Sequence, residues 1–216
     1  MRKLATLIGV ILLYAACKSE DKQATLPIYG NRDTKTITKD GKKVVDTIYQ
    51  TIPAFKFVNQ YGDSITQNSL KGDIYVADFF FTTCPSICPI MHRNMLKVYN
   101  EFKNVSDFKI ISHSIDPKHD SVPVLKKYAD GLGITGNSWW LLQGKKDDTY
   151  NLSTSYLVRR PEESAKELFI HDGYFVLIDK QKHIRGSYDG TDEKDVARMI
   201  GDIKILRAET NTQIAQ

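Results

Sequence analysis

The sequence predicts a single α/β domain in which helices cover both faces of a mixed β-sheet and a hairpin is added at the amino-terminal end. The chain has 216 residues, of which 41% are hydrophobic and 26% charged, enough for one well-filled core and too few for two ordinary domains. Strand-like and helix-like segments alternate along most of it, and a strand pair and a helix close it. No repeat of 20 to 50 residues is present, so a solenoid is excluded.

The first predicted elements lie before residue 82. Val44–Ile52 has the pattern of a strand, and Ala54–Thr66 that of a hairpin turning at residues 61–63. Asp73–Phe81 is nearly continuously apolar and rich in aromatic and β-branched residues. Such a run is typical of a central strand that is buried on both faces.

The later elements alternate between helix and strand. Met91–Phe102 is predicted to be a helix, Phe108–Ile115 a buried strand and Ser121–Leu132 a helix. Four further elements are expected: a strand at Trp139–Gln143, a helix at Asp147–Tyr156, a hairpin of Gly173–Asp179 with His183–Gly190, and a last helix with an apolar stripe of Val196, Met199, Ile200, Ile203 and Leu206. This order resembles a thioredoxin-like fold.

The amino terminus has the parts of a bacterial signal peptide. Two cations precede an apolar run, Leu4–Leu13, which is too short for a typical membrane-spanning helix. Tyr14-Ala15-Ala16-Cys17 resembles a lipobox, although Tyr14 stands where leucine is usual, and an uncleaved amino-terminal anchor is the alternative. We therefore expect a membrane-anchored lipoprotein of the bacterial cell envelope, acylated at Cys17, with its domain outside the cytoplasm.

The predicted organisation has four parts. These are a signal peptide (1–16), a lipidated amino terminus and polar linker (17–43), the folded domain (44–208) and a polar tail (209–216). Removal of the signal peptide leaves 28 basic and 26 acidic residues, a net charge of +2. Because basic and acidic residues are so nearly balanced, the chain offers no basic stripe for phosphate groups, and we expect no nucleic-acid partner.

Cys84 and Cys88 are the cysteines that remain once Cys17 is set aside. A domain of this size needs no disulfide to build a core, and so short a loop gains little stability from one, although a small structural disulfide remains an alternative. The pair lies where a buried strand leads into a helix, and unpaired backbone N–H groups there favour thiolates. Because proline is tolerated in a first helical turn, we place Pro89 near the first helical position and Cys88 near the N-cap.

The spacing and number of thiols favour a soft metal. Three residues separate the cysteines, not the two of thioredoxin's redox motif, and structural zinc usually takes four ligands. Cu(I) accepts two or three soft ligands, and a histidine is the expected third. Local spacing favours His92, whereas His171 opens a strand expected to begin near the cysteine loop; Met91 and Met95 offer thioether sulfur but are typical of core filling. The histidines are His92, His113, His119, His171 and His183.

Four segments together resemble the Sco/SenC family of copper-binding proteins associated with assembly of cytochrome c oxidase. They are TTCPSICPIM (82–91), SIDPKHDSVPVLKKYA (114–129), GITGNSWW (133–140) and HDGYFVLID (171–179). The resemblance runs from about Ile48 to Leu206. It implies a thioredoxin-like domain that binds copper, as Cu(I) or also as Cu(II), through residues matching Cys84, Cys88 and His171.

Two aspartates follow the next buried strand. The resemblance matches Asp116 to the family's Asp-Pro aspartate. It implies that Asp116 adjusts the properties of the copper site by contacting its ligands and not the metal itself. The alternative is that Asp116 is a turn residue before Pro117. Asp120 is expected to cap the helix that begins near Ser121.

The resemblance implies a metallochaperone, not an enzyme, that delivers copper to the binuclear copper centre of the copper-bearing subunit of cytochrome c oxidase. The alternative is a thiol-disulfide reductase, itself kept reduced by a thioredoxin-like partner, that keeps the cysteines of that centre reduced. A peroxidase of thioredoxin-like fold is a weaker hypothesis. A non-enzymatic interaction domain leaves the cysteine pair unexplained.

Overall fold

A computed structural model describes residues 25–158 and 173–214. The strands are β1 (Arg32–Lys39), β2 (Lys42–Tyr49), β3 (Lys56–Asn59), β4 (Ser64–Thr66), β5 (Ile74–Phe80), β6 (Phe108–Ser114), β7 (Trp139–Gln143), β8 (Tyr174–Ile178) and β9 (Ile184–Asp189). The helices are α1 (Ile87–Phe102), α2 (Val122–Gly131), α3 (Lys146–Ser155) and α4 (Glu193–Ile214), with a 3-10 turn at Gln67–Leu70. Within these ranges no helix is long and apolar enough to cross a membrane. The predicted lipidation site Cys17 and the predicted ligand His171 lie outside the described residues.

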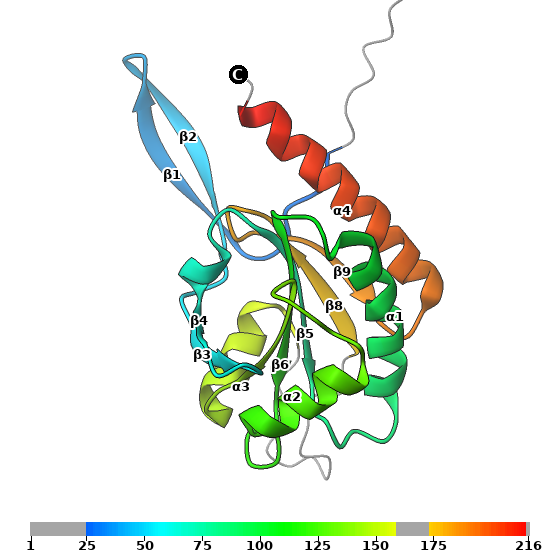
Figure 1. The fold of residues 1–216 in the computed structure, drawn as a ribbon. Coiled ribbons are helices and arrows are strands. Elements are labelled where there is room, and N and C mark those ends of the chain that lie inside the picture. The colour runs from blue at the N-terminus through cyan, green and yellow to red at the C-terminus, as the bar shows by residue number, and fades with distance from the viewer. Residues whose placement is uncertain (1–24, 159–172, 215–216) are drawn as a thin grey trace, which may run out of the picture.

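Seven strands form one mixed sheet in the order β4-β3-β7-β6-β5-β8-β9. Strands β5, β6 and β7 are parallel neighbours, whereas β8 runs antiparallel to β5, and β3 antiparallel to β7. Helices α1, α2 and α4 lie on one side of the sheet and α3 on the other (Figure 1). The predicted mixed sheet with helices on both faces is confirmed.

Strand β5 is the centre of the core, and each of its seven residues is buried. Alternate side chains therefore point into two different layers. Asp78 meets His92 of α1 on one face, at 3.2 Å between Oδ2 and Nε2. On the other face the hydroxyls of Tyr75 and Tyr156, which follows α3, lie 3.1 Å apart. This double burial explains why the strand is apolar almost throughout.

Most predicted elements are present at their expected places. The β3–β4 and β8–β9 hairpins are confirmed, and the apolar stripe of α4 is buried at Val196, Met199, Ile203 and Leu206. Helix α1 begins at Ile87, two residues before Pro89, which the sequence placed near the first helical position. Pro89 is its third residue, where a backbone N–H has no partner within a helix, so the proline removes no helical hydrogen bond.

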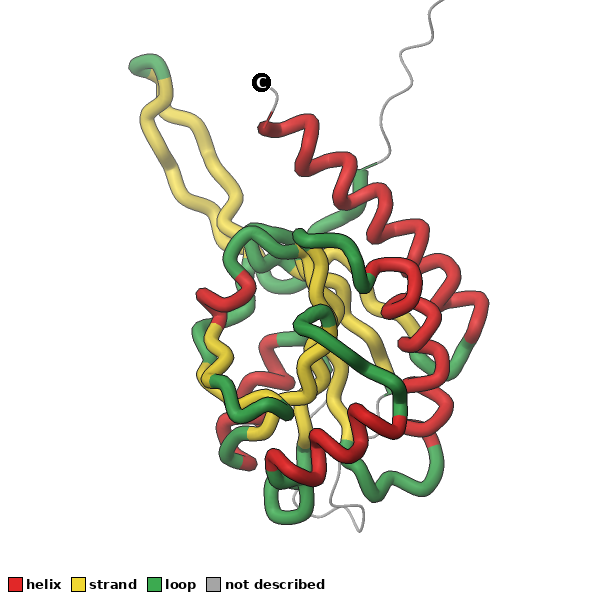
Figure 2. Tube along the Cα trace, in the orientation of Figure 1, coloured by secondary structure: helices red, strands yellow, loops and turns green. Residues whose placement is uncertain are grey.

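Strands β1 and β2 form a separate ribbon that projects from the body (Figures 1 and 2). The sequence predicted a polar linker up to residue 43, and β1 lies in that stretch. The strands are joined by Asp40 and Gly41, whose φ angles of 52° and 74° fit the two-residue turns typical of hairpins. The ribbon continues into Ile52, whose N–H bonds the carbonyl of Lys182 in the β8–β9 turn. It therefore starts at the end of the sheet opposite the carboxyl end of β5.

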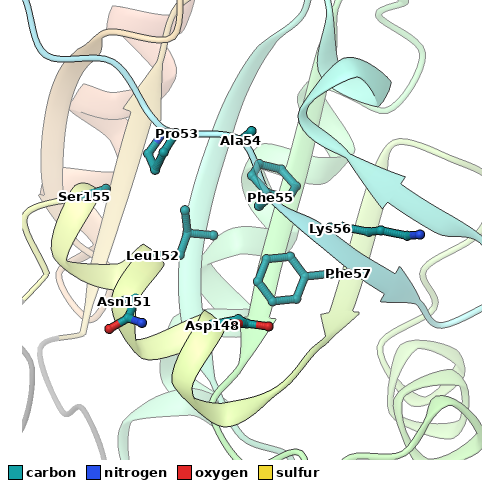
Figure 3. Close-up of a pocket in the computed structure, with 9 residues that line it drawn as sticks. All are labelled: Pro53, Ala54, Phe55, Lys56, Phe57, Asp148, Asn151, Leu152 and Ser155. Atoms are coloured by element: carbon teal, nitrogen blue, oxygen red, sulfur yellow. The ribbon is translucent and has the colours of Figure 1, made fainter.

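His113 of β6 is enclosed by aromatic rings on the α3 face of the sheet. Phe79 stacks on it at 5.2 Å between centroids, and Phe55, Phe57 and Tyr156 contact it at 5.8, 5.1 and 6.0 Å. Phe55 and Phe57 also line a cavity of about 440 Å³ beside α3 (Figure 3). Neither ring nitrogen of His113 has a hydrogen-bond partner among the described residues. Burial lowers the pKa of His113 to about 3.

We predict that His113 makes the protein less stable in acid. Below the unfolded pKa of 6.5 the unfolded chain binds a proton that the folded chain excludes until about pH 3, so stability falls as the pH falls through this window. Between pH 7 and pH 5 this one group removes about 2 kcal/mol from the free energy of unfolding. Denaturant unfolding of His113→Phe at both pH values should show a smaller loss by about that amount. An equal loss in both proteins would contradict the prediction.

Candidate functional site

The two cysteines lie in the loop and first helical turn that follow β5. Cys84 is in a turn in which its N–H bonds the carbonyl of Phe81 at 3.2 Å. Helix α1 has Ser86 as its N-cap, without a side-chain capping bond, and Cys88 is its second residue. The sequence predicted Cys88 nearer the N-cap, so the helix begins slightly earlier than expected.

The structure brings the two cysteines together. The backbone N–H of Cys88 donates to Sγ of Cys84 at 3.4 Å, so the sulfur accepts from a free N–H of the first helical turn. Both thiols are free, and the residues are only 6% and 3% exposed. The expectation that they are neighbours is therefore confirmed.

The two thiols have opposite pKa shifts. Burial raises the pKa of Cys84, but hydrogen bonds from the side chain and backbone of Cys88 and from Ser86 outweigh it, and the net pKa is below the usual value. Burial also raises the pKa of Cys88, and the bond to Cys84 and the charge of Asp78 raise it further. Cys84 is thus the thiol that deprotonates first.

Asp120 holds the cysteine loop from the side of α2. Its carboxylate accepts hydrogen bonds from the backbone N–H and hydroxyl of Thr82 and, at 2.5 Å, from the hydroxyl of Ser114. The sequence predicted that Asp120 caps α2, which is wrong: Ser121 is the N-cap, and it makes no side-chain capping bond. A carboxylate with no solvent exposure needs several donors, and the loop and strand β6 supply them.

His92 is fully buried and both of its ring nitrogens have partners. Nε2 lies 3.2 Å from Asp78, and Nδ1 lies 2.9 Å from the hydroxyl of Tyr128 in α2. Asp78 also accepts from Ser112 at 2.5 Å, and Ser112 accepts from Trp139 at 2.9 Å. A ring held in this way joins helices and sheet and has no free nitrogen for a metal. Sequence reasoning missed this network, because its members are far apart along the chain.

Asp116 pairs with the side chain of His119 in the turn that follows β6. Its Oδ2 lies 2.6 Å from Nδ1 of His119, which is largely exposed, and its N–H donates to Ser114. Among the described residues, its carboxylate makes no hydrogen bond to either cysteine. Any effect of Asp116 on the thiols remains a prediction. The remaining described histidine, His183, lies in the β8–β9 turn at the opposite end of the sheet.

Gly173 brings the end of a distant segment to the cysteine helix. A Cβ added at Gly173 would lie 3.7 Å from Cδ1 of Ile87 and 4.0 Å from Sδ of Met91. Its carbonyl accepts from Gly190 at 2.8 Å, which fixes the start of β8 beside the first turn of α1. Met91 and Met95 are both buried in the core, as expected of core-filling residues.

Comparisons with known proteins identify the family. The family model described as SCO1/SenC matches residues 46–206. The chain belongs to the SCO1/SenC family. A relative described as SCO1 protein homolog, from Bacillus subtilis (strain 168), is 30% identical over 169 residues, which are 76% of this chain and 86% of the relative.

Two solved structures of the family resemble the fold. A SCO1/SenC family lipoprotein from Bacillus anthracis str. Ames has a TM-score of 0.66 and 30% identity, covering 73% of this chain and 95% of its own. A structure of BsSco has a TM-score of 0.63 and 29% identity, and the match covers 72% of this chain and 92% of the BsSco chain. BsSco is a member of the Sco family of cytochrome c oxidase assembly proteins in which a disulfide switch has been identified. The predicted Sco/SenC resemblance and its thioredoxin-like fold are confirmed.

The described part of this SCO1/SenC chain supplies two adjacent sulfur atoms to its site. Within that part, no group of three or more His, Cys, Asp or Glu side chains could hold a metal ion. Two thiols that differ in pKa can bind a soft metal when both are deprotonated, or can be oxidised together to a disulfide.

We predict that Cys84 reacts faster than Cys88 with a small alkylating reagent near pH 7.5. Only the thiolate reacts, and each unit of pKa difference changes its fraction about tenfold. Mass spectrometry after brief labelling of the reduced protein should find the label mainly on Cys84. Cys88→Ser should still label readily and Cys84→Ser slowly. Preferential labelling of Cys88 would contradict the assignment.

Proposed function

We propose that this SCO1/SenC protein is a membrane-tethered copper chaperone. It holds copper, as Cu(I), on Cys84, Cys88 and His171 and delivers it to the binuclear copper centre of cytochrome c oxidase. The observation that carries the proposal is the pair of adjacent, buried thiols at the β5–α1 junction, one of them with a lowered pKa. Thiolate sulfur is the ligand that Cu(I) prefers.

The position of Gly173 supports His171 as the third ligand. Two residues of chain span at most about 7 Å, and Gly173 already lies against the helical turn that contains Cys88. The local competitor, His92, has both nitrogens bonded, one to the buried Asp78 and the other to the partly buried Tyr128. Using it as a ligand would leave Asp78 or Tyr128 without its hydrogen bond, which is costly in a buried site.

The copper is cargo, and the chain's own groups control its binding. Cys84 presents the thiolate first, and Cys88 gives up its proton when the metal binds. Oxidation of the two thiols to a disulfide removes both sulfur ligands, so copper binding requires the reduced pair. A coordination number of two or three leaves the metal open to attack by an acceptor's ligands.

The difference between the thiols also favours a second function, thiol-disulfide reduction. The low-pKa Cys84 is suited to attack a substrate disulfide, which forms a mixed disulfide and releases one substrate thiolate. Cys88, once deprotonated, then attacks Cys84, which releases the second substrate thiolate and leaves a Cys84–Cys88 disulfide. The substrate would be the oxidised cysteine pair of the oxidase copper centre. A disulfide switch has been identified in the relative BsSco, which supports redox chemistry at such a pair.

We predict that reduced protein binds one Cu(I) per chain and that His171→Ala weakens this binding about tenfold or more. His92→Gln, which keeps a hydrogen-bonding side chain in the core, should bind copper as the wild type does. Anaerobic titration against a chromophoric Cu(I) chelator measures both. Equal affinities for wild type and His171→Ala, or undiminished binding by the disulfide form, would contradict the ligand set.

The same variant separates the two functions, because thiol-disulfide exchange requires no imidazole. If the protein is a chaperone, His171→Ala should lower oxidase activity in copper-limited cells nearly as far as loss of either cysteine does. The rate at which the purified His171→Ala variant reduces a small disulfide substrate should stay close to that of the wild type. Full oxidase activity in that strain would support the reductase.

The tether rests on Cys17. We predict that the mature chain begins at Cys17, carries acyl chains there and remains in the membrane fraction in high salt, because two or more chains anchor a protein firmly. Mass spectrometry and fractionation of wild type and Cys17→Ser test this. An unmodified Cys17 that follows an intact residue 1–16 segment would refute it.

A further inference from the structure

An apolar groove lies between α1 and α2, directly beside the cysteine loop. It has a volume of about 590 Å³. Thr82 and Pro89, which stand on either side of the two cysteines in sequence, belong to its wall. Figure 1 shows α2 crossing near the end of α1 at which that helix begins. The groove and the proposed copper site therefore share one end of the molecule.

The two helices present regularly spaced residues to the groove. Pro89 and Arg93 are four residues apart on α1, and Val124, Tyr128 and Gly131 recur at helical spacing on α2. Pro89 and Val124 are exposed, and a Cβ added at Gly131 would meet no atom within 4 Å. Gly131 therefore leaves open space at this position in the wall of the groove.

The charged side chains of the groove are both cations. Arg93 and Lys127 line it, and no acidic residue of the described chain does. Neither cation forms a hydrogen bond or ion pair with another described side chain. The cavity of Figure 3 differs, since Lys56 and Asp148 give it both signs of charge. The groove therefore complements an acidic surface.

Tyr128 connects the groove to the site. Its ring lines the groove while its hydroxyl bonds His92 at 2.9 Å. Pro89, the residue that directly follows Cys88 in the first turn of α1, lines the groove as well. A partner seated in the groove has its surface close to Cys84 and Cys88.

We propose that this groove is the docking site for the protein that receives the copper, and that it binds an acidic segment of that protein carrying an aliphatic or aromatic side chain. The inference rests on the proposed chaperone function. The apolar side chain fills the space beside Gly131, and the acidic groups pair with Arg93 and Lys127. Complementary charge of this kind raises the rate of encounter, and the filled pocket slows dissociation.

Three variants of the mature chain test the proposal. Arg93→Glu with Lys127→Glu reverses the charge, and Gly131→Leu fills the groove from an open position. Lys39→Glu with Lys43→Glu is the matched control, because it makes the same change in net charge on the exposed ribbon at the far end of the sheet. The partner is the purified copper-bearing domain of the oxidase subunit from the same bacterium, and both association without copper and transfer of Cu(I) are followed at several salt concentrations.

Wild type should associate faster at low salt than at high salt. The charge reversal should slow association about tenfold at low salt and remove its salt dependence. Gly131→Leu should weaken the complex about tenfold at all salt concentrations. The control should stay within about twofold of wild type, and all four proteins should bind Cu(I) with equal affinity.

Two results overturn the proposal. In the first, both groove variants associate with the partner at the wild-type rate. In the second, the wild type self-associates and Gly131→Leu abolishes that self-association, which assigns the groove to a second copy of this chain. Failure of the proposed function gives a different result. In that case the wild type forms the complex through the groove but transfers no copper.

Discussion

The buried carboxylate of Asp78 determines how the elements around the site are arranged. It lies in the middle of β5 without solvent contact, where an unpaired charge or dipole is strongly unfavourable. Ser112 of β6 and His92 of α1 satisfy it, and His92 in turn bonds Tyr128 of α2. These bonds tie two strands and two helices into one geometry. The first turn of α1, with Cys88 in it, is positioned as a consequence.

A second carboxylate performs the same task for the loop before that turn. Asp120 binds Thr82 and Ser114, so the chain leaving β5 is held at a fixed distance from β6 while it turns into α1. The turn places Cys84 where the N–H of Cys88 points at its sulfur. The two thiols therefore differ in proton affinity for a geometric reason, since one accepts hydrogen bonds and the other is surrounded by core and negative charge.

The two ends of the sheet have separate features. The cysteine loop, the start of β8 and the groove between α1 and α2 lie at the carboxyl end of β5, and the exposed ribbon begins at the opposite end. Chemistry at the thiols and contact with a partner can thus occur on one side of the molecule. The buried His113 belongs to neither, because aromatic rings on the α3 face separate it from solvent.

The sequence by itself determined the strands of the main sheet, the helices that cover it, the cysteine pair and the family. It could do so because the periodicity of apolar residues and the spacing of motifs are local properties of the chain. It missed β1, since a ribbon exposed on both faces has no apolar alternation, although Asp40-Gly41 is a typical turn. It misread Asp120, because a cap and a loop clamp use the same residue type. Only the tertiary structure decided which donors surround Asp120 and His92 and which thiol has the lower pKa. Those properties depend on atoms brought together from distant parts of the sequence, and burial sets their energies.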